Sequence, residues 1–213
     1  TAFNQPIGDW DVSSVTDMTK MFYGNFAFNQ PIGDWDVSNV TDMTEMFSSN
    51  TAFNQPIGDW DVSSVTDMFL IFYEAEVFNQ DISSWDVSNI TNMQGMFAYA
   101  YDFNQPIGDW DVSNITNMQG MFARSSFNQD IGNWDVSQVT DMYAMFANTP
   151  FNQEISSWDV SSVIFMDSMF QDAITFNQNL NSWNVDNVTI CNSFSDNSPL
   201  TEANTPNFTN CTP

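Results

Sequence analysis

One repeating unit runs through the whole chain, and it constrains the fold more than any other feature. The tripeptide Phe-Asn-Gln recurs eight times at intervals of 24 or 25 residues, and a Trp follows each Phe by seven residues. A period of this length indicates a stacked array of small units rather than a globular domain. The repeats are marked by Phe3, Phe28, Phe53, Phe78, Phe103, Phe127, Phe151 and Phe176.

Each repeat carries two apolar patterns. The segment Trp10-Asp11-Val12 alternates apolar and polar residues, as a half-buried strand does. Val15, Met18, Met21 and Phe22 follow at the spacing of a short helix or 3₁₀ turn. We therefore expect a repeat solenoid of eight coils, each with one short parallel strand and one short helical or 3₁₀ turn. Stacking would bury the Phe, Ile, Trp, Val and Met positions in one shared core.

The array has predicted boundaries. Eight repeats are expected over residues 1–198, beginning near residues 1, 26, 51, 76, 101, 126, 150 and 174. The repeats decay near the end, where the Thr-Asp pair becomes Ile164-Phe165, so residues 199–213 are expected to form a C-terminal cap. The chain starts inside a repeat, which favours a piece of a longer protein.

The two cysteines, Cys191 and Cys211, both lie near the C-terminus. A disulfide between them would tie the tail to the final repeat and would favour an oxidising compartment. Two reduced, buried thiols are the alternative.

The repeat resembles a known family. The rhythm Ile7-x-x-Trp10-x-Val12-x-x-Val15 is similar to that of leucine-rich repeats, with Trp and Val in place of Leu. The wider motif, Phe-Asn-Gln-Pro-Ile-x-x-Trp-Asp-Val-Ser-x-Val-Thr-Asp-Met-x-x-Met-Phe, resembles the BspA-like, DUF285 repeat of bacterial surface proteins from residue 1 to about 198. This resemblance implies a leucine-rich-repeat-like coil on secreted or lipid-anchored proteins.

The charge excludes several partners. The chain holds 27 Asp and Glu, no His, and only two cations, Lys20 and Arg124, for a net charge of −25. Nucleic acids and anionic membranes need clustered Lys or Arg, so neither is expected to bind. No apolar run is long enough to span a membrane.

Catalysis is not expected. Without His, a Ser-His or Cys-His nucleophile system cannot form. Asp recurs from coil to coil, and such repetition argues against one unique pair of catalytic carboxylates. We therefore predict that the chain is not an enzyme.

A row of Asp residues follows the Trp positions and is predicted to point outward as the contact surface. Carboxylates about 4.8 Å apart repel by about 0.9 kcal/mol in water-like surroundings and about 3.5 kcal/mol at an effective dielectric of 20. Two interpretations stay open: an acidic face stabilised by hydrogen bonds, water and salt, or a row of Ca²⁺ sites between coils. The contact row is Asp11, Asp36, Asp61, Asp86, Asp111, Asp135 and Asp159. The calcium sites would use Asp9, Asp11, Asp34, Asp36, Asp59, Asp61, Asp109 and Asp111.

Three further columns and the scattered tyrosines have expected roles. Asp17 and its equivalents precede the helical turn and could cap its N-terminus. The Asn4 and Gln5 columns are expected to form an amide ladder that bonds the backbone at the bends. The tyrosines cluster near the helical side as candidate exposed contacts: Tyr23, Tyr73, Tyr99, Tyr101 and Tyr143.

Together these patterns predict a non-enzymatic, extracellular or cell-surface module. It would mediate adhesion or interaction through its acidic face, assisted by Ca²⁺ in one of the two interpretations. The expected partner is a protein or glycan on a cell or matrix surface, and repetition along one rod would raise avidity. The alternative is a structural spacer, or a matrix-forming segment that associates end to end with other copies.

Overall fold

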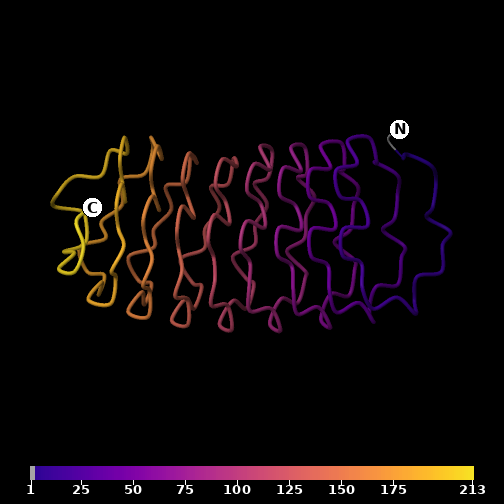
Figure 1. Ribbon diagram of the computed structural model, residues 1–213, viewed down its shortest axis with the longest axis horizontal. Helices are drawn as coiled ribbons and strands as arrows, with labels where there is room; N and C mark the ends of the chain where they lie inside the picture. Colours follow the sequence, from indigo (N-terminus) through magenta and orange to yellow (C-terminus); the bar gives the residue numbers. More distant parts are fainter. Residues whose placement is uncertain (1–2) are drawn as a thin grey trace.

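The computed structural model of the protein describes residues 3–213. The chain winds into a row of stacked coils, one for each repeat, with the two ends of the chain at opposite ends of the row (Figure 1). No α-helix and no multi-residue β-strand occurs within residues 3–213. Successive coils are joined by single-residue parallel bridges: Asp17–Asp42, Asp42–Asp67, Asn92–Asn117, Asn117–Asp141, Asp141–Phe165 and Phe165–Ile190.

The predicted leucine-rich-repeat-like coil of one strand and one helical turn is therefore wrong. The strand was expected at Trp10–Val12, but the parallel bridges lie at the position of Asp17. The expected helical turn is replaced by consecutive β-turns. The error has a physical cause: a chain of β-turns also returns an apolar side chain to the core every third or fourth residue, as a helix does.

These β-turns form what we call the turn ribbon, residues 18–25 in the first coil and the equivalent residues in each later one. The N–H groups of Met21, Tyr23 and Asn25 donate to carbonyl groups three residues earlier, over 3.1–3.2 Å. The N–H groups of Lys20, Phe22 and Gly24 alternate with these and donate to the next coil; that of Lys20, for example, donates to the carbonyl of Thr44 at 2.9 Å. Turn and inter-coil hydrogen bonds thus alternate along the ribbon and satisfy its backbone.

Left-handed residues set the geometry of the ribbon. The positions of Lys20 and Gly24 have positive φ in every coil, including non-glycine residues such as Leu70 at 53° and Arg124 at 59°. A right-handed helix needs negative φ at every residue, so these positions exclude it. Each non-glycine residue there costs about 1 kcal/mol, which the two sets of hydrogen bonds and the packing below the ribbon must offset.

The predicted shared core is confirmed. Phe, Ile, Trp, Val and Met side chains from successive coils are buried in one continuous cluster. Rings of two Phe columns alternate through it: Phe72 stacks on Phe78 with centroids 3.9 Å apart, and on Phe97 of the next coil at 5.7 Å. The indole N–H of Trp85 donates to the carbonyl of Ile57 in the preceding coil at 3.0 Å, so this buried polar atom is satisfied.

The amide columns form the predicted ladder. The side-chain oxygen of Asn29 accepts the backbone N–H of Asn54 and the amide N–H of Gln55, both at 2.9 Å. The same pattern links Asn54 to Asn79 and Gln80 in the next coil. These side chains therefore hold neighbouring coils together at a bend where the structure has no parallel bridge.

The C-terminal segment packs on the last coil. The predicted disulfide is present: Cys191 and Cys211 are bonded, with their Cα atoms 5.9 Å apart. Leu200 and Phe208 pack against the core, and the ring of Phe208 meets that of Phe194 edge-on at 5.0 Å. The segment thereby covers apolar side chains of the last coil.

One buried side chain is unsatisfied, and it gives a prediction about stability. Asn50 is 0% exposed, and within the described chain neither its amide nitrogen nor its amide oxygen has a hydrogen-bond partner. Later coils place Ala75 and Ala100 at the same position. We expect Asn50→Ala to raise the free energy of unfolding by about 1 kcal/mol or more, because an unsatisfied buried group costs about 1–3 kcal/mol.

Chemical denaturation of the purified protein measures this gain. The matched control is Asn25→Ala at the same position of the first coil. The Asn25 amide donates to the carbonyl of Phe3 at 2.8 Å, so this change should lower stability. A loss of stability in Asn50→Ala equal to that in Asn25→Ala would contradict the account.

Candidate functional site

The predicted acidic row lies on the surface. All seven carboxylates, from Asp11 to Asp159, are exposed. Each accepts a hydrogen bond from the backbone two residues later; Asp61, for example, binds the N–H of Ser63 at 3.1 Å and its hydroxyl at 2.6 Å. Such bonds favour the ionised form of a carboxyl. The pKa is lowered in this way at Asp11, Asp36, Asp61, Asp111 and Asp159.

The geometry gives the calcium hypothesis no support. Within residues 3–213, no three side chains of Asp, Glu, Cys or His gather as a metal site. A hollow of about 410 Å³ is lined by Asp34, Asp59 and Asp81, but these carboxylates do not converge on one point within it. The serine bonds to the Asp11 row already stabilise its negative charge locally.

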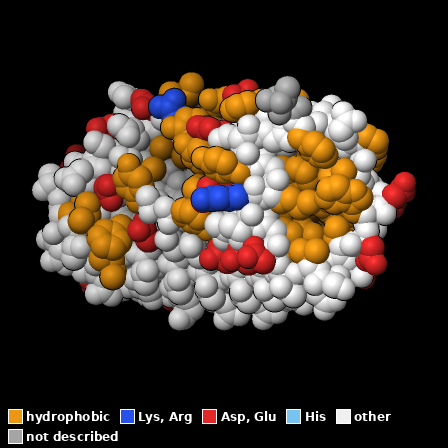
Figure 2. All heavy atoms as spheres, turned by 45° about the vertical axis from the view of Figure 1, so that its right-hand side comes forward, with side chains coloured by type: hydrophobic (Ala, Val, Ile, Leu, Met, Phe, Trp, Pro, Cys, Tyr) orange, Lys and Arg blue, Asp and Glu red, His pale blue; other side chains and the backbone are white. Residues whose placement is uncertain are grey.

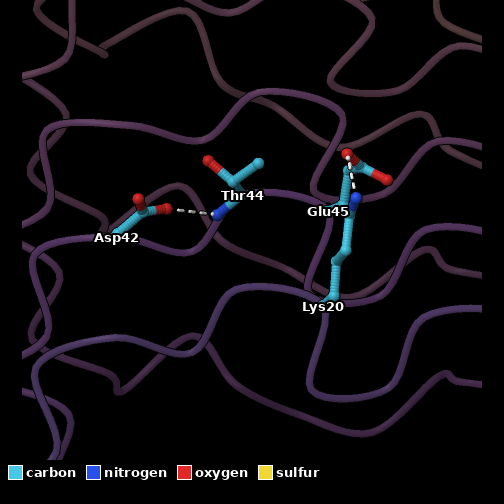
Figure 3. A network of polar contacts seen from close by, with 4 residues as sticks. All are labelled: Lys20, Asp42, Thr44 and Glu45. Carbon is cyan, nitrogen blue, oxygen red and sulfur yellow. Dashed lines mark hydrogen bonds and ion pairs between the residues drawn. The ribbon is translucent and has the colours of Figure 1, made fainter.

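The Asp17 column has a local structural role. Asp42 accepts the N–H of Thr44 at 2.8 Å, at the start of its turn ribbon (Figure 3). Asn92 and Asn117 bind the equivalent N–H groups of later coils. The expected helix cap is wrong because no helix follows; the side chain instead binds the first free N–H of the ribbon.

A different surface distinguishes one coil from another. We call it the turn face: the positions of Thr19, Lys20, Tyr23 and Gly24 in each turn ribbon. Small residues at the Tyr23 position, Ser48, Ala98 and Ala147, are buried. Inward positions repeat Met and Phe almost unchanged, whereas the Lys20 position holds Lys, Glu, Leu, Gly, Gly, Ala, Ser and Ser in succession. Packing between coils explains why the inward residues are constant, but it does not explain which residue each coil has at these variable positions. Figure 2 shows Lys and Arg side chains beside hydrophobic ones on one side of the molecule.

The middle of the turn face is hollowed into a groove of about 310 Å³. Gly95, Gly120 and Ala123 are among the small residues that line it, and Tyr99 and Arg124 are among the large ones. The guanidinium of Arg124 lies 5.4 Å from the centre of the Tyr99 ring. The other cation, Lys20, lies outside the groove and pairs with Glu45 at 3.2 Å (Figure 3).

The sequence did not predict the groove, but it did predict three of the lining residues as surface contacts. Tyr73, Tyr99 and Tyr143 were expected as surface contacts, and all three line the groove. The missed signal is the change in this column from the large residues Lys20, Glu45 and Leu70 to a run of small ones that begins with Gly95, Gly120 and Ala144. This succession creates a hollow only because the ribbon places these positions outward.

The comparison with known families agrees with the repeat. Residues 1–109 and 100–208 match the family model described as "Mycoplasma protein of unknown function, DUF285". The chain belongs to the DUF285 family. No curated protein and no solved structure matches it. The predicted resemblance of this DUF285 chain is thus confirmed, whereas the leucine-rich-repeat-like coil that it implied is not. Over residues 3–213 the structure also contains no helix long and apolar enough to cross a membrane.

The serine bonds of the acidic row give a prediction about titration. We expect Ser63→Ala to raise the pKa of Asp61 toward its ordinary value, because the hydroxyl bond that favours the ionised carboxyl is lost. Carbon-detected NMR titration of the carboxyl measures the shift. Ser64→Ala is the matched control, since no bond joins Ser64 to Asp61, and it should leave the pKa unchanged. An equal effect of both substitutions would disprove the assigned bond.

Asp141 gives a second prediction, of opposite sign. Burial beside Tyr143 and Phe165 raises the pKa of this carboxyl, so its ionisation destabilises the fold at pH values above that pKa. Asp141→Asn should therefore raise the melting temperature at pH 7. The gain should shrink as pH falls through the raised pKa and be largely gone below the ordinary value of about 4.

Thermal melts across this pH range test the effect of Asp141. The control is Asp17→Asn, because bonds from Thr19 lower the pKa of Asp17, and the ionised form is favoured in the fold. That substitution should bring no gain at pH 7. A pH-independent gain in Asp141→Asn would contradict the assignment.

Proposed function

We propose that this DUF285 chain is a non-enzymatic, extracellular binding module that contacts its partner through the turn face. One observation carries the proposal. The stack repeats its inward positions almost unchanged, while the outward positions of the turn ribbon differ from coil to coil. A rigid frame with a variable face can present a specific set of side chains to a partner.

The physical properties of the chain support this role. Each coil bonds to its neighbours through the ribbon, the amide ladder and the core, so the coils hold surface side chains at fixed spacing. The disulfide between Cys191 and Cys211 supports an oxidising, extracellular setting. The sequence contains no His to serve as a general base.

The acidic row is the second candidate surface. Its exposure and repetition fit multivalent contact with a cationic partner. We rank it below the turn face because each carboxylate already stabilises a local turn, which explains why the row is constant.

An attachment assay compares the two surfaces directly. Beads coated with the protein are applied to cultured cells and to immobilised extracellular matrix, and retention is measured under flow. We expect the double variant Tyr73→Ala/Tyr99→Ala to lose at least tenfold in retention. The double variant Asp61→Asn/Asp86→Asn should retain as well as the wild type.

Melting curves confirm that each variant is folded before the assay. If only the Asp61→Asn/Asp86→Asn variant loses retention, the acidic row and not the turn face is the binding surface. Equal retention of all folded variants would contradict a binding role for either face and favour the structural spacer.

A further inference from the structure

The groove on the turn face differs in charge from the rest of the molecule. The chain carries 27 carboxylates, yet no Asp or Glu lines this groove. One of the two cations of the chain, Arg124, does line it. Among the lining residues a cationic ligand would find no counter-charge, whereas an anionic group would find Arg124; the carboxylate of Glu74 lies beside Tyr73.

Arg124 is available to such a group. Within residues 3–213 the one ion pair joins Lys20 to Glu45, so no carboxylate of the described chain pairs with Arg124. Its side chain is exposed and lies near the Tyr99 ring. A guanidinium near an aromatic ring keeps N–H groups able to bind a carboxylate through two parallel hydrogen bonds.

The other lining residues suit a sugar. Tyr73, Tyr99 and Tyr143 provide aromatic surface for the apolar faces of sugar rings, and Gln119 and Asn148 provide amides that donate to and accept from hydroxyls. The groove is open at Gly120, where an added Cβ would meet no atom within 4 Å, whereas at Gly95 the Leu70 side chain occupies that space. The groove is within the volume range of small-molecule sites.

A peptide fits less well. Recognition of an extended peptide commonly uses free backbone groups at a sheet edge. Under this groove those donors are already bound: Gly95 donates to Gln119, Gly120 to Tyr143 and Arg124 to Ala147, at 2.7–2.9 Å. Recognition must therefore come from side chains, which favours a ligand with hydroxyl edges and ring faces.

We propose that the groove binds a short oligosaccharide that bears a carboxylate, such as one containing a uronic or sialic acid. Arg124 binds the carboxylate, Tyr99 packs against a sugar ring, and Gln119 and Asn148 bind hydroxyls. The lining residues come from five successive coils, a span of about 19 Å at the spacing of paired chains. This inference rests on the proposed binding role of the turn face and specifies its ligand.

Isothermal titration calorimetry with defined sugars tests the inference. The probes are 3′-sialyllactose and trigalacturonic acid, with lactose as the neutral sugar, in about 0.15 M salt so that the net charge is screened beyond about 8 Å. We expect at least one acidic sugar to bind at least tenfold more tightly than lactose. Arg124→Gln should weaken that binding at least tenfold, and Arg124→Lys should fall between, because Lys keeps the charge without the planar fork.

The chain provides a matched control. Lys20 lies 5.5 Å from the Tyr23 ring on the same face but outside the groove. Lys20→Gln changes the net charge by the same amount as Arg124→Gln and should leave affinity within twofold of the wild type. Likewise Tyr99→Ala should weaken binding at least tenfold, and Tyr23→Ala should not.

Three results would overturn the inference: no binding of either acidic sugar, equal binding by Arg124→Gln and wild type, or tighter binding of a tetraglutamate peptide than of both acidic sugars. The bead assay separates this failure from that of the proposed function. If cell attachment depends on Tyr73 and Tyr99 while neither acidic sugar binds, the binding role of the turn face stands and the ligand class is wrong.

Discussion

The fold depends on the fact that no coil can satisfy its own backbone or bury its own rings. In every coil before the last, alternate N–H groups of the turn ribbon find acceptors in the next coil, as Phe97 does at Met121. The Phe97 ring likewise packs between Phe72 and Phe122 of the neighbouring coils. Stacking is therefore the condition for folding, and the positions that serve it are the ones that repeat.

The sequence predicted those contacts that depend on side-chain type. The apolar columns predicted the core, the Asn and Gln columns the amide ladder, and Cys191 with Cys211 the disulfide. Repetition alone was enough here, because a column of equivalent residues must meet its own copies when units stack.

The backbone conformation could not be predicted in the same way. Positions with a left-handed backbone conformation are usually occupied by glycine, which makes them recognisable in a sequence. Here many of them hold other residues, such as Leu70, Glu74 and Arg124. Without that signal, the spacing of Met18, Met21 and Phe22 fits a helical turn as well as a chain of β-turns. The groove was missed for the same reason, since only the ribbon geometry places Gly95 and Gly120 outward over a hollow.

The constant surface row of this molecule and its proposed binding surface are different sets of residues. The Asp11 row is constant, and its hydrogen bonds to Ser13 and equivalent serines give it a structural role. The turn face is variable. Positive φ favours glycine at Gly95 and Gly120, but the stack does not explain the Tyr and Arg residues of this face. The constant columns of this stack thus serve the contacts between coils, and the variable outward columns are the surface on which the proposed binding function rests.

The central claim is that β-turns bonded to the next coil replace any helix in the ribbon. NMR scalar couplings across hydrogen bonds test it most directly in residues 93–100. The account predicts couplings from Phe97 N–H to the Met121 carbonyl and from Tyr99 N–H to the Ala123 carbonyl, together with turn bonds from Ala98 to Gly95. Couplings between N–H and carbonyl groups four residues apart within 93–100, with none to residues 118–125, would contradict it.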